Sequence, residues 1–202
     1  MTFFKEIINN FAAKLYSFGK GRYEQNQWEK LKKQFQNIGE NAQIKFPLKV
    51  KNPQCITIGN NFFSLYNLRL EAWNRYSEYV FSPQIVIGNN VTFNTDCHVG
   101  CINKIEIGND VLIGSHVLIT DHSHGNIDAE ALLEPPSKRI LISKGPVKIG
   151  NKVWIGNGVC IMPGVCIGDN CIIGANTVVT KSFPENCVLA GNPAKIIKTF
   201  NV

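Results

Sequence analysis

VKIGNKVWIGNGVCIMPGVCIGDNCIIGANTVV, residues 147–179, repeats one six-residue pattern without a slip. A β-branched apolar residue fills one position of every unit, and these positions are 149, 155, 161, 167, 173 and 179. Neither the two-residue period of a strand nor the 3.6-residue period of a helix produces this spacing. A strict six-residue repeat predicts a parallel β-helix, in which each unit contributes one short strand and one turn.

Shorter runs of the same repeat stand earlier in the chain. The branched or aromatic position recurs at 87, 93 and 99, and again at 107, 113 and 119. A partial unit occupies residues 56–61, and an eight-residue step after Val99 marks an insertion near residues 102–104. Three units close one triangular coil, so we expect about four to five coils in a single β-helix domain at residues 51–202.

Residues 1–50 follow a different pattern. Apolar residues recur at three- and four-residue steps over residues 3–18, which predicts a helix that Gly19 and Gly21 interrupt. Residues 23–35 suggest a second, weaker helix. We expect this region to cap the first coil or to contact another subunit. The lysine and arginine side chains among its aromatic residues leave open a peripheral membrane contact.

The composition excludes several classes of protein. The chain has no apolar run of 18 or more residues and no signal-peptide pattern, so we expect neither a membrane span nor secretion. Its seven cysteines are an odd number without a C-x-x-C pair, which is typical of the reducing cytoplasm. The net charge of +6 has no block of like charges. This charge argues weakly for an anionic ligand and against nucleic acid.

A long inserted loop, residues 121–146, interrupts the repeats. Solenoids usually break their period on the binding face, and long loops in compact domains are often functional. The loop opens with Asp121, His122, Ser123 and His124, so it holds two of the four histidines. Imidazole titrates near neutral pH, and the two histidines together with the broken repeat make this loop the predicted site. Asp121 either holds one imidazole or forms a turn.

The repeats, this loop, the stretch Val153–Gly156 and the tail Ala190–Lys195 resemble the left-handed β-helix (hexapeptide-repeat) acyltransferases. Within that family the chain is most similar to the maltose and galactoside O-acetyltransferases and the bacterial polysaccharide (lipopolysaccharide) O-acetyltransferases, over roughly residues 55–200. The resemblance implies an all-β, left-handed parallel β-helix with an N-terminal helical cap and a short C-terminal helix. It also implies acetyl-CoA as co-substrate, no metal, and a homotrimer with active sites between neighbouring subunits.

The resemblance assigns roles to individual residues. The family's catalytic histidine stands seventeen residues after the isoleucine that matches Ile107, which selects His124 as the general base. His122 could instead orient the loop, bind the acceptor or be the base, and Asn94 matches an asparagine that contacts the acceptor or the oxyanion. The matching cofactor residues are Trp154 in the acetyl and pantetheine channel, Asn157, Ala175 and Thr180 along the groove edge, and Lys181, Lys195 and Lys198 around the phosphates.

The resulting expectation is an acetyl-CoA-dependent O-acetyltransferase that acts on a sugar hydroxyl of a cell-surface polysaccharide or its precursor. An N-acetyltransferase of an amino sugar and an antibiotic-modifying acetyltransferase are the alternatives. A zinc hydratase of the γ-carbonic anhydrase kind fits less well, because that class places two histidines five residues apart and the separations here are 18, 6 and 2. A non-catalytic β-helix scaffold is a further alternative, but it does not explain the histidine-bearing loop.

Overall fold

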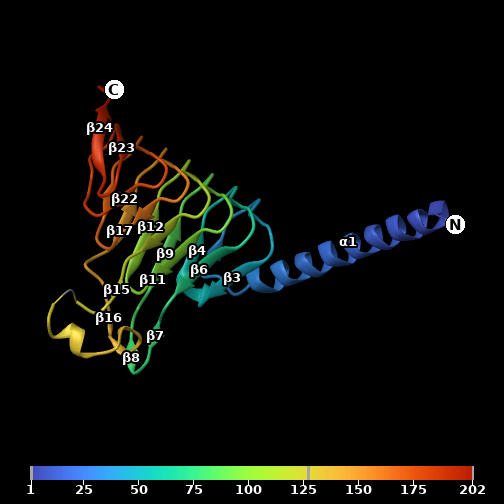
Figure 1. Ribbon diagram of the computed structural model, residues 1–202, viewed down its shortest axis with the longest axis horizontal. Coiled ribbons are helices and arrows are strands. Elements are labelled where there is room, and N and C mark those ends of the chain that lie inside the picture. The colour runs from blue at the N-terminus through green and yellow to red at the C-terminus, as the bar shows by residue number, and fades with distance from the viewer. Residues whose placement is uncertain (1, 127, 202) are drawn as a thin grey trace. The chain divides into compact units, whose positions relative to one another are not determined.

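The computed structural model describes residues 2–126 and 128–201, except the side chains of residues 2–5, 7, 8 and 10. The chain divides into two compact units, residues 1–34 and 35–202. The first unit contains the helix α1 (Thr2–Lys32), and the second is a β-helix (Figure 1). Within the described residues, no helix is both long and apolar enough to cross a membrane.

The expected break between two N-terminal helices is wrong, because α1 runs through both Gly19 and Gly21. A glycine inside a helix costs only about 1 kcal/mol relative to alanine, so good helix formers on either side outweigh it. Phe11, Leu15 and Phe18 are exposed on this helix. Several apolar side chains of the predicted pattern, at residues 3, 4, 7 and 8, lie outside the described side chains.

Three sheets form the faces of the β-helix, and each of six coils contributes one parallel strand to each sheet. Sheet 2 has two further strands, β23 and the antiparallel β24. Sheet 1 contains β1 (Asn37–Ile38), β4 (Ile56–Ile58), β9 (Gln84–Ile87), β12 (Lys104–Ile107), β17 (Val147–Ile149) and β20 (Cys166–Ile167). Sheet 2 contains β2 (Gln43–Ile44), β5 (Phe63–Ser64), β10 (Thr92–Phe93), β13 (Leu112–Ile113), β18 (Trp154–Ile155), β21 (Ile172–Ile173), β23 (Cys187–Ala190) and β24 (Lys195–Thr199). Sheet 3 contains β3 (Leu48–Lys51), β6 (Leu68–Ala72), β11 (His98–Cys101), β14 (Leu118–Thr120), β19 (Cys160–Ile161) and β22 (Val178–Val179).

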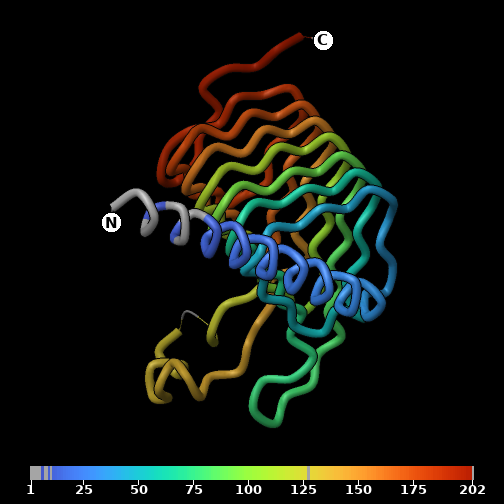
Figure 2. The backbone as a smooth tube through the Cα atoms, turned by 90° about the vertical axis from the view of Figure 1, so that its right-hand side faces the viewer, coloured from blue at the N-terminus to red at the C-terminus, as the bar shows by residue number. Residues whose placement is uncertain are grey.

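The coils stack in chain order, as Figure 2 shows, and sheet 3 has one strand from each of six coils. The first coil, β1 to β3, covers residues 37–51 and so lies almost wholly within residues 1–50, where the sequence placed the helical region. Ile38, Ile44 and Val50 of this coil do repeat every six residues. The parallel β-helix itself is confirmed, and it begins one coil earlier than expected.

The branched positions of the repeat fill the interior. Ile113, Ile155 and Ile161 are 0% exposed, so stacked coils bury their apolar side chains directly on one another. At one corner, asparagine side chains join successive coils: the backbone N–H of Asn89 donates to Oδ1 of Asn109 at 2.8 Å. The same bond recurs along the corner between the pairs Asn60–Asn89, Asn109–Asn151 and Asn151–Asp169.

Two excursions leave the β-helix between sheet 3 and sheet 1. The first carries the antiparallel hairpin of β7 (Arg75–Tyr76) and β8 (Tyr79–Val80). The second is the inserted loop, with the hairpin of β15 (Ser123–His124) and β16 (Leu141–Ile142) and two short 3-10 turns, Ala131–Leu133 and Pro136–Lys138. A third 3-10 turn, Pro53–Cys55, follows β3. The Tyr76 hydroxyl donates to the Ser137 carbonyl at 2.7 Å, so the two excursions contact each other.

The expected C-terminal helix is wrong. The chain ends in β24, which pairs antiparallel with β23 at the edge of sheet 2. Ile196, Ile197 and Thr199 are β-branched and favour a strand. Pairing with β23 also satisfies backbone groups that an open sheet edge would leave free.

Candidate active site

The inserted loop begins with a buried carboxylate that holds its first histidine. β14 ends at Thr120, and the next side chain, Asp121, is 0% exposed. One oxygen of Asp121 accepts a hydrogen bond from the Ile102 N–H at 2.9 Å and lies 3.0 Å from Nδ1 of His122. The other oxygen accepts from the Asn103 N–H at 2.8 Å. Asp121 therefore fixes both the start of the loop and the ring of His122.

The charge of Asp121 sets the tautomer of His122. Burial raises the pKa of Asp121, but hydrogen bonds from His122 and from the N–H groups of Ile102 and Asn103 outweigh burial and lower it. At neutral pH Asp121 is then an ionised carboxylate, which can only accept hydrogen bonds. The proton of a neutral His122 ring must lie on Nδ1, so Nε2 keeps its lone pair and can accept a proton.

A second pair of carboxylate and imidazole lies on the neighbouring strands. Glu71 on β6 is 1% exposed, and its carboxylate lies 3.1 Å from Nε2 of His98 on β11. The Lys49 ammonium lies 2.8 Å and the Arg69 guanidinium 2.9 Å from the same carboxylate. Burial raises the pKa of Glu71, but these two cations outweigh it and lower the pKa to about 2. Burial and the nearby charge of Arg69 lower the pKa of His98.

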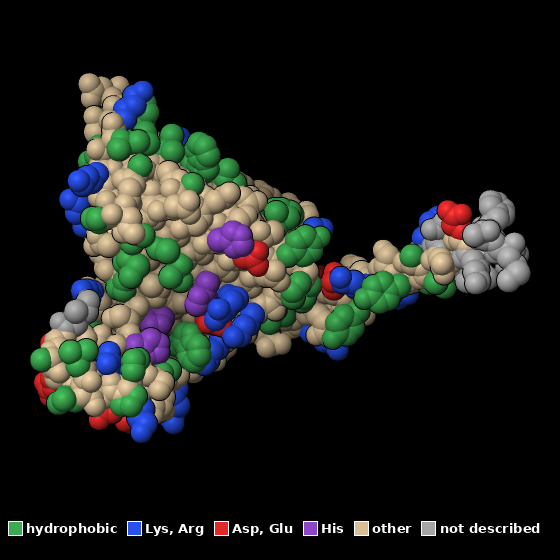
Figure 3. All heavy atoms as spheres, in the orientation of Figure 1, with side chains coloured by type: hydrophobic (Ala, Val, Ile, Leu, Met, Phe, Trp, Pro, Cys, Tyr) green, Lys and Arg blue, Asp and Glu red, His purple; other side chains and the backbone are tan. Residues whose placement is uncertain are grey.

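Gly100 brings the two pairs together. Its register partners are Glu71 on β6 and Thr120 on β14. A Cβ atom on Gly100 would lie 3.4 Å from Cε1 of His122 and 3.4 Å from Nε2 of His98, so both rings lie over this glycine. Figure 3 shows histidine side chains close together on one face, next to a cluster of Lys and Arg. The absence of a side chain at Gly100 leaves room for both imidazoles.

His124 lies in a different environment. Its side chain is exposed, and its ring packs edge-on against Tyr76, with ring centroids 5.4 Å apart. Tyr76 also contacts the ring of Trp73 edge-on, at a centroid distance of 6.3 Å. His124 therefore belongs to an aromatic group, whereas His122 has a buried carboxylate partner.

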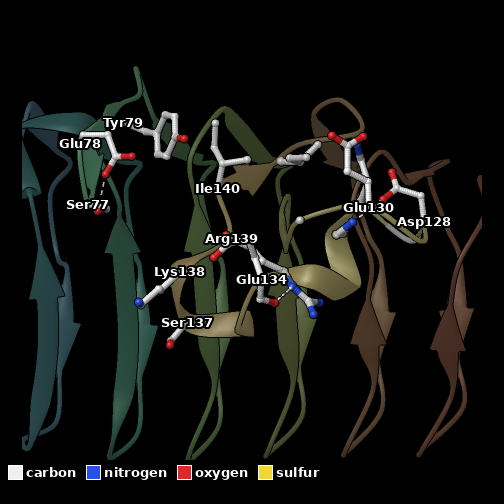
Figure 4. Close-up of a pocket in the computed structure, with 14 residues that line it drawn as sticks. Ser77, Glu78, Tyr79, Asp128, Glu130, Glu134, Ser137, Lys138, Arg139 and Ile140 are labelled. Carbon is white, nitrogen blue, oxygen red and sulfur yellow. Dashed lines mark hydrogen bonds between the residues drawn. The ribbon is translucent and has the colours of Figure 1, made fainter.

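A cavity of about 760 Å³ lies between the two excursions, next to His124 in the sequence (Figure 4). Tyr79 and Ile140 contribute to its wall, and Arg139 donates from Nε to the Glu134 carbonyl at 2.8 Å. The wall carries both signs of charge: the acidic residues are Glu78, Asp128, Glu130 and Glu134, and the basic residues are Lys138 and Arg139. This cavity can hold a polar molecule, but its charges do not favour an anion.

Three of the predicted cofactor residues lie close together. Trp154 on β18 is 53% exposed and pairs in register with the exposed Leu112 on β13. Asn157 and Ala175 lie at the corner that follows sheet 2, one coil apart. A Cβ atom on Gly156 would lie only 2.7 Å from the backbone nitrogen of Ala175, which shows how tightly these coils stack. An outward aromatic side chain beside a narrow corner is suited to a long, thin ligand.

The remaining predicted cofactor residues lie near the C-terminal hairpin. The basic ones, named here the three C-terminal lysines, are Lys181, Lys195 and Lys198, and all three are exposed. Thr180 follows β22, and the Ala194 N–H donates to the Val178 carbonyl of β22 at 2.9 Å. This bond brings the turn before Lys195 to the strand that precedes Thr180.

Asn94 is half-buried at the corner after β10, where its N–H donates to the Ile113 carbonyl at 2.9 Å. Neither Glu71 nor His98 was predicted from the sequence as a site residue. Alternation along β6 places Glu71 on the outer face, so only the coils on either side reveal that it is buried.

Within residues 2–126 and 128–201, no three His, Cys, Asp or Glu side chains converge as they would on a metal ion.

The low pKa of Glu71 predicts acid sensitivity. Because its pKa falls from 4.5 to about 2 on folding, its contribution to stability is complete above pH 4.5 and is lost as the pH falls toward 2. The lost contribution amounts to at most about 3 kcal/mol of unfolding free energy. Glu71→Gln should therefore show a smaller decrease in unfolding free energy than the wild type in denaturant titrations between these pH values. The exposed Glu185→Gln serves as the control, and an equal acid response of the wild type and Glu71→Gln would contradict the prediction.

Known proteins resemble both the sequence and the fold. The family description "Bacterial transferase hexapeptide (six repeats)" matches residues 146–181. The Escherichia coli K12 protein WbbJ, assigned to lipopolysaccharide biosynthesis as an O-acetyl transferase, is 42% identical over 162 residues, which cover 78% of this chain and 79% of WbbJ.

Solved structures of sugar acetyltransferases have the same fold as this chain. A maltose O-acetyltransferase from Clostridium difficile 630 superimposes with a TM-score of 0.58 at 33% identity, over 85% of this chain and 73% of that one. A galactoside acetyltransferase in complex with coenzyme A gives a TM-score of 0.58 at 32% identity, over 85% of this chain and 68% of that one. With these matches over most of its length, the chain belongs to the hexapeptide-repeat acetyltransferase family.

Proposed function

We propose that this protein transfers the acetyl group of acetyl-CoA to a hydroxyl group of a saccharide, and that His122 is the general base. The observation that carries the proposal is the buried Asp121 carboxylate 3.0 Å from Nδ1 of His122, which leaves Nε2 free to accept a proton. The similarity to WbbJ supports a saccharide of the lipopolysaccharide type or its precursor as the acceptor. The solved galactoside acetyltransferase with coenzyme A supports acetyl-CoA as the donor.

In the proposed reaction, Nε2 of His122 removes the hydroxyl proton as the saccharide oxygen attacks the thioester carbon. The C–S bond of the tetrahedral intermediate then breaks, and the CoA sulfur leaves with the proton held by the imidazolium. Asp121 stabilises the imidazolium by its charge throughout this cycle. The sequence selected His124 by counting along the loop. The geometry supports His122 instead, because of these two loop histidines it is His122 that has a carboxylate to fix its tautomer. Asn94 remains a proposed contact of the acceptor or the oxyanion.

The donor site and the assembly are proposed together. Trp154 would line the pantetheine channel, Asn157, Ala175 and Thr180 would form its edge, and the three C-terminal lysines would contact the phosphates. We propose a homotrimer, because the exposed Leu112 and Trp154 form an outward apolar row on sheet 2 that a neighbouring subunit and the pantetheine together would cover. Light scattering at micromolar concentration measures this assembly directly.

Release of free CoA thiol from acetyl-CoA tests the proposed activity. The purified protein is incubated with neutral saccharides, acidic saccharides, nucleotide sugars and amino sugars, and acetylated products are identified by mass spectrometry. Acceptor-dependent thiol release with an acetyl ester as product supports the proposal. Release with amino sugars alone, giving an amide, would show an N-acetyltransferase, and no release with any acceptor class would reject the activity.

The three C-terminal lysines are expected to recognise the phosphates of CoA. Changing all three to alanine should weaken CoA binding about tenfold at low salt, since each exposed charge contact contributes roughly 0.5 kcal/mol. Binding of 3′-dephospho-CoA should weaken less, because it lacks one of the recognised groups. Isothermal titration calorimetry measures both affinities. A control variant with Lys45, Lys104 and Lys148 changed to alanine carries the same charge loss, and an equal effect of the two variants would refute specific recognition.

A further inference from the structure

Sheet 3 carries a row of cations that the proposed chemistry does not use. We propose that Lys49, Lys51 and Arg69, together with Trp73, form an acceptor subsite that binds a saccharide bearing a carboxylate or a phosphate. These four residues are named here the basic ladder. The proposal rests on the proposed function, since it identifies the chemical class of the acceptor, and it is argued from the position, charge and shape of the ladder.

The ladder lies next to the proposed base. Lys49 and Arg69 are register partners on β3 and β6, and Arg69 is in turn the partner of His98 on β11. His98 and His122 lie over the same glycine, Gly100. The coils of a β-helix stack at the spacing of paired strands, about 4.8 Å, so the ladder lies within one sugar unit or two of His122. A saccharide bound there can present a hydroxyl to Nε2 of His122.

The ladder carries more positive charge than the neighbouring Glu71 carboxylate neutralises. Lys49, Lys51 and Arg69 are three cations, and Glu71 is the one anion paired with them, which leaves two positive charges. The Lys49 and Arg69 side chains are 65% and 45% exposed, although both contact Glu71. A guanidinium has five N–H donors and an ammonium three, so most of these donors remain free for a ligand. Glu71 therefore orients the cations and does not neutralise the group.

Trp73 gives the ladder an aromatic wall. The Lys51 ammonium lies 3.2 Å from the centroid of the Trp73 ring, which holds the lysine in place. Burial lowers the pKa of Lys51, and Glu71 nearby opposes this effect. Trp73 is half-buried and contacts Tyr76, which contacts His124. Aromatic faces beside a few fixed polar groups are typical of sites for small ligands. The 760 Å³ cavity beyond His124 carries more carboxylates than cations, so the ladder is the better place for an anion.

Ligand-detected NMR in the absence of acetyl-CoA tests the subsite directly. The probes are methyl β-D-glucoside, methyl β-D-glucuronide and methyl β-D-glucoside 6-phosphate, which share one ring and differ in charge. We expect at least one anionic probe to bind on the order of tenfold more tightly than the neutral one at low salt, as one charged hydrogen bond provides. The preference should decrease at high ionic strength. Whichever anionic probe binds more tightly identifies the carboxylate or the phosphate as the natural group.

Lys51→Met is the decisive variant, because it keeps an apolar chain over Trp73 and leaves Glu71 with its three direct partners, Lys49, Arg69 and His98. It should remove most of the preference for the anionic probes, leave the affinity for the neutral glucoside unchanged, and keep the melting temperature. Lys49 and Arg69 are less suitable, since their loss leaves Glu71 with fewer partners and can unfold the protein. Lys148→Met is the matched control: Lys148 also contacts a carboxylate, Glu106 at 3.4 Å, but lies on sheet 1.

The outcomes separate the subsite from the proposed activity. Equal affinity for neutral and anionic probes, or equal effects of Lys51→Met and Lys148→Met, would overturn the subsite whether or not acetyl transfer occurs. Adding acetyl-CoA to the same samples then measures transfer. Anion binding that depends on Lys51 without acetylation of any saccharide would support the subsite and reject the proposed function.

Discussion

His122→Ala is expected to lower the turnover number by about 10²–10⁴-fold, the usual effect of losing a positioned general base. The affinity for CoA should remain unchanged, because Lys181 follows β22 of the last coil and Lys195 and Lys198 lie on β24. The fold should also survive, since Asp121 retains hydrogen bonds from the Ile102 and Asn103 N–H groups. Steady-state kinetics of thiol release, together with calorimetry of CoA binding, measures both quantities.

His124→Ala is the matched control for this variant, because it removes the same ring two residues later. We expect a smaller loss of turnover, accompanied by a higher KM for the acceptor, since His124 packs on Tyr76 and not on a carboxylate. The opposite order, with His124→Ala inactive and His122→Ala active, would return the role of base to His124. In that case the buried Asp121 would only support the loop.

Asp121→Asn should be the most damaging isosteric change in the site. Both oxygens of Asp121 accept hydrogen bonds, from Ile102 and His122 on one side and from Asn103 and the Cys101 thiol on the other. An asparagine would direct an NH₂ group toward one of these pairs of donors. We expect a loss of about 2–4 kcal/mol of unfolding free energy, because at least one buried donor is left without an acceptor. Turnover should decrease by about 10²-fold or more, because the tautomer of His122 is no longer fixed.

Denaturant titration and steady-state kinetics measure the two effects separately. Asp110→Asn is the control, since its exposed carboxylate accepts one hydrogen bond from the Asn90 side chain at 2.8 Å and lies at a corner of the coil. An Asp121→Asn protein with the stability of the wild type and unchanged turnover would show that the Asp121–His122 contact has no role in catalysis.

The repeat predicts the coils where several units with a branched or aromatic interior residue follow one another. It fails where that position changes: Ser64 occupies the place of the branched residue in β5 and is buried, so the second coil shows only a partial unit in the sequence. The first coil was missed for another reason. Ile38, Ile44 and Val50 keep the six-residue spacing, but they follow directly on an apolar helical region. Three apolar residues at this spacing do not stand out from the apolar residues of such a region.

The ends of the chain depend on interactions that a local pattern does not contain. Gly19 and Gly21 predict a break, but helix propensity is a weak contribution that neighbouring residues can outweigh. The terminal residues 195–199 are two lysines and three β-branched residues without strict alternation, and pairing with β23 decides that they form a strand. Strand pairing depends on a partner distant in the sequence, which a local pattern cannot identify.

For the site, the sequence predicts the loop and not the detailed chemistry. His122 and His124 have the same side chain and lie two residues apart. A small insertion in the loop is therefore enough to move the count from one histidine to the other. The two histidines differ because His122 contacts the buried carboxylate of Asp121. The N–H groups of Ile102 and Asn103 in the preceding coil hold that carboxylate in place. Glu71 is likewise recognisable only when β3, β6 and β11 are stacked, because its partners come from three coils.

The asparagine corner has a consequence for how order is lost in this protein. The Asn side chains at this corner bond only adjacent coils, so a coil is held by its two neighbours and the stack behaves as a one-dimensional array. Fraying then starts at the terminal coils and moves inward. Glu71, His98 and Asp121 come from the second, third and fourth of six coils. Transient opening of either end can therefore admit solvent or release a terminal strand while the proton-transfer groups stay in register.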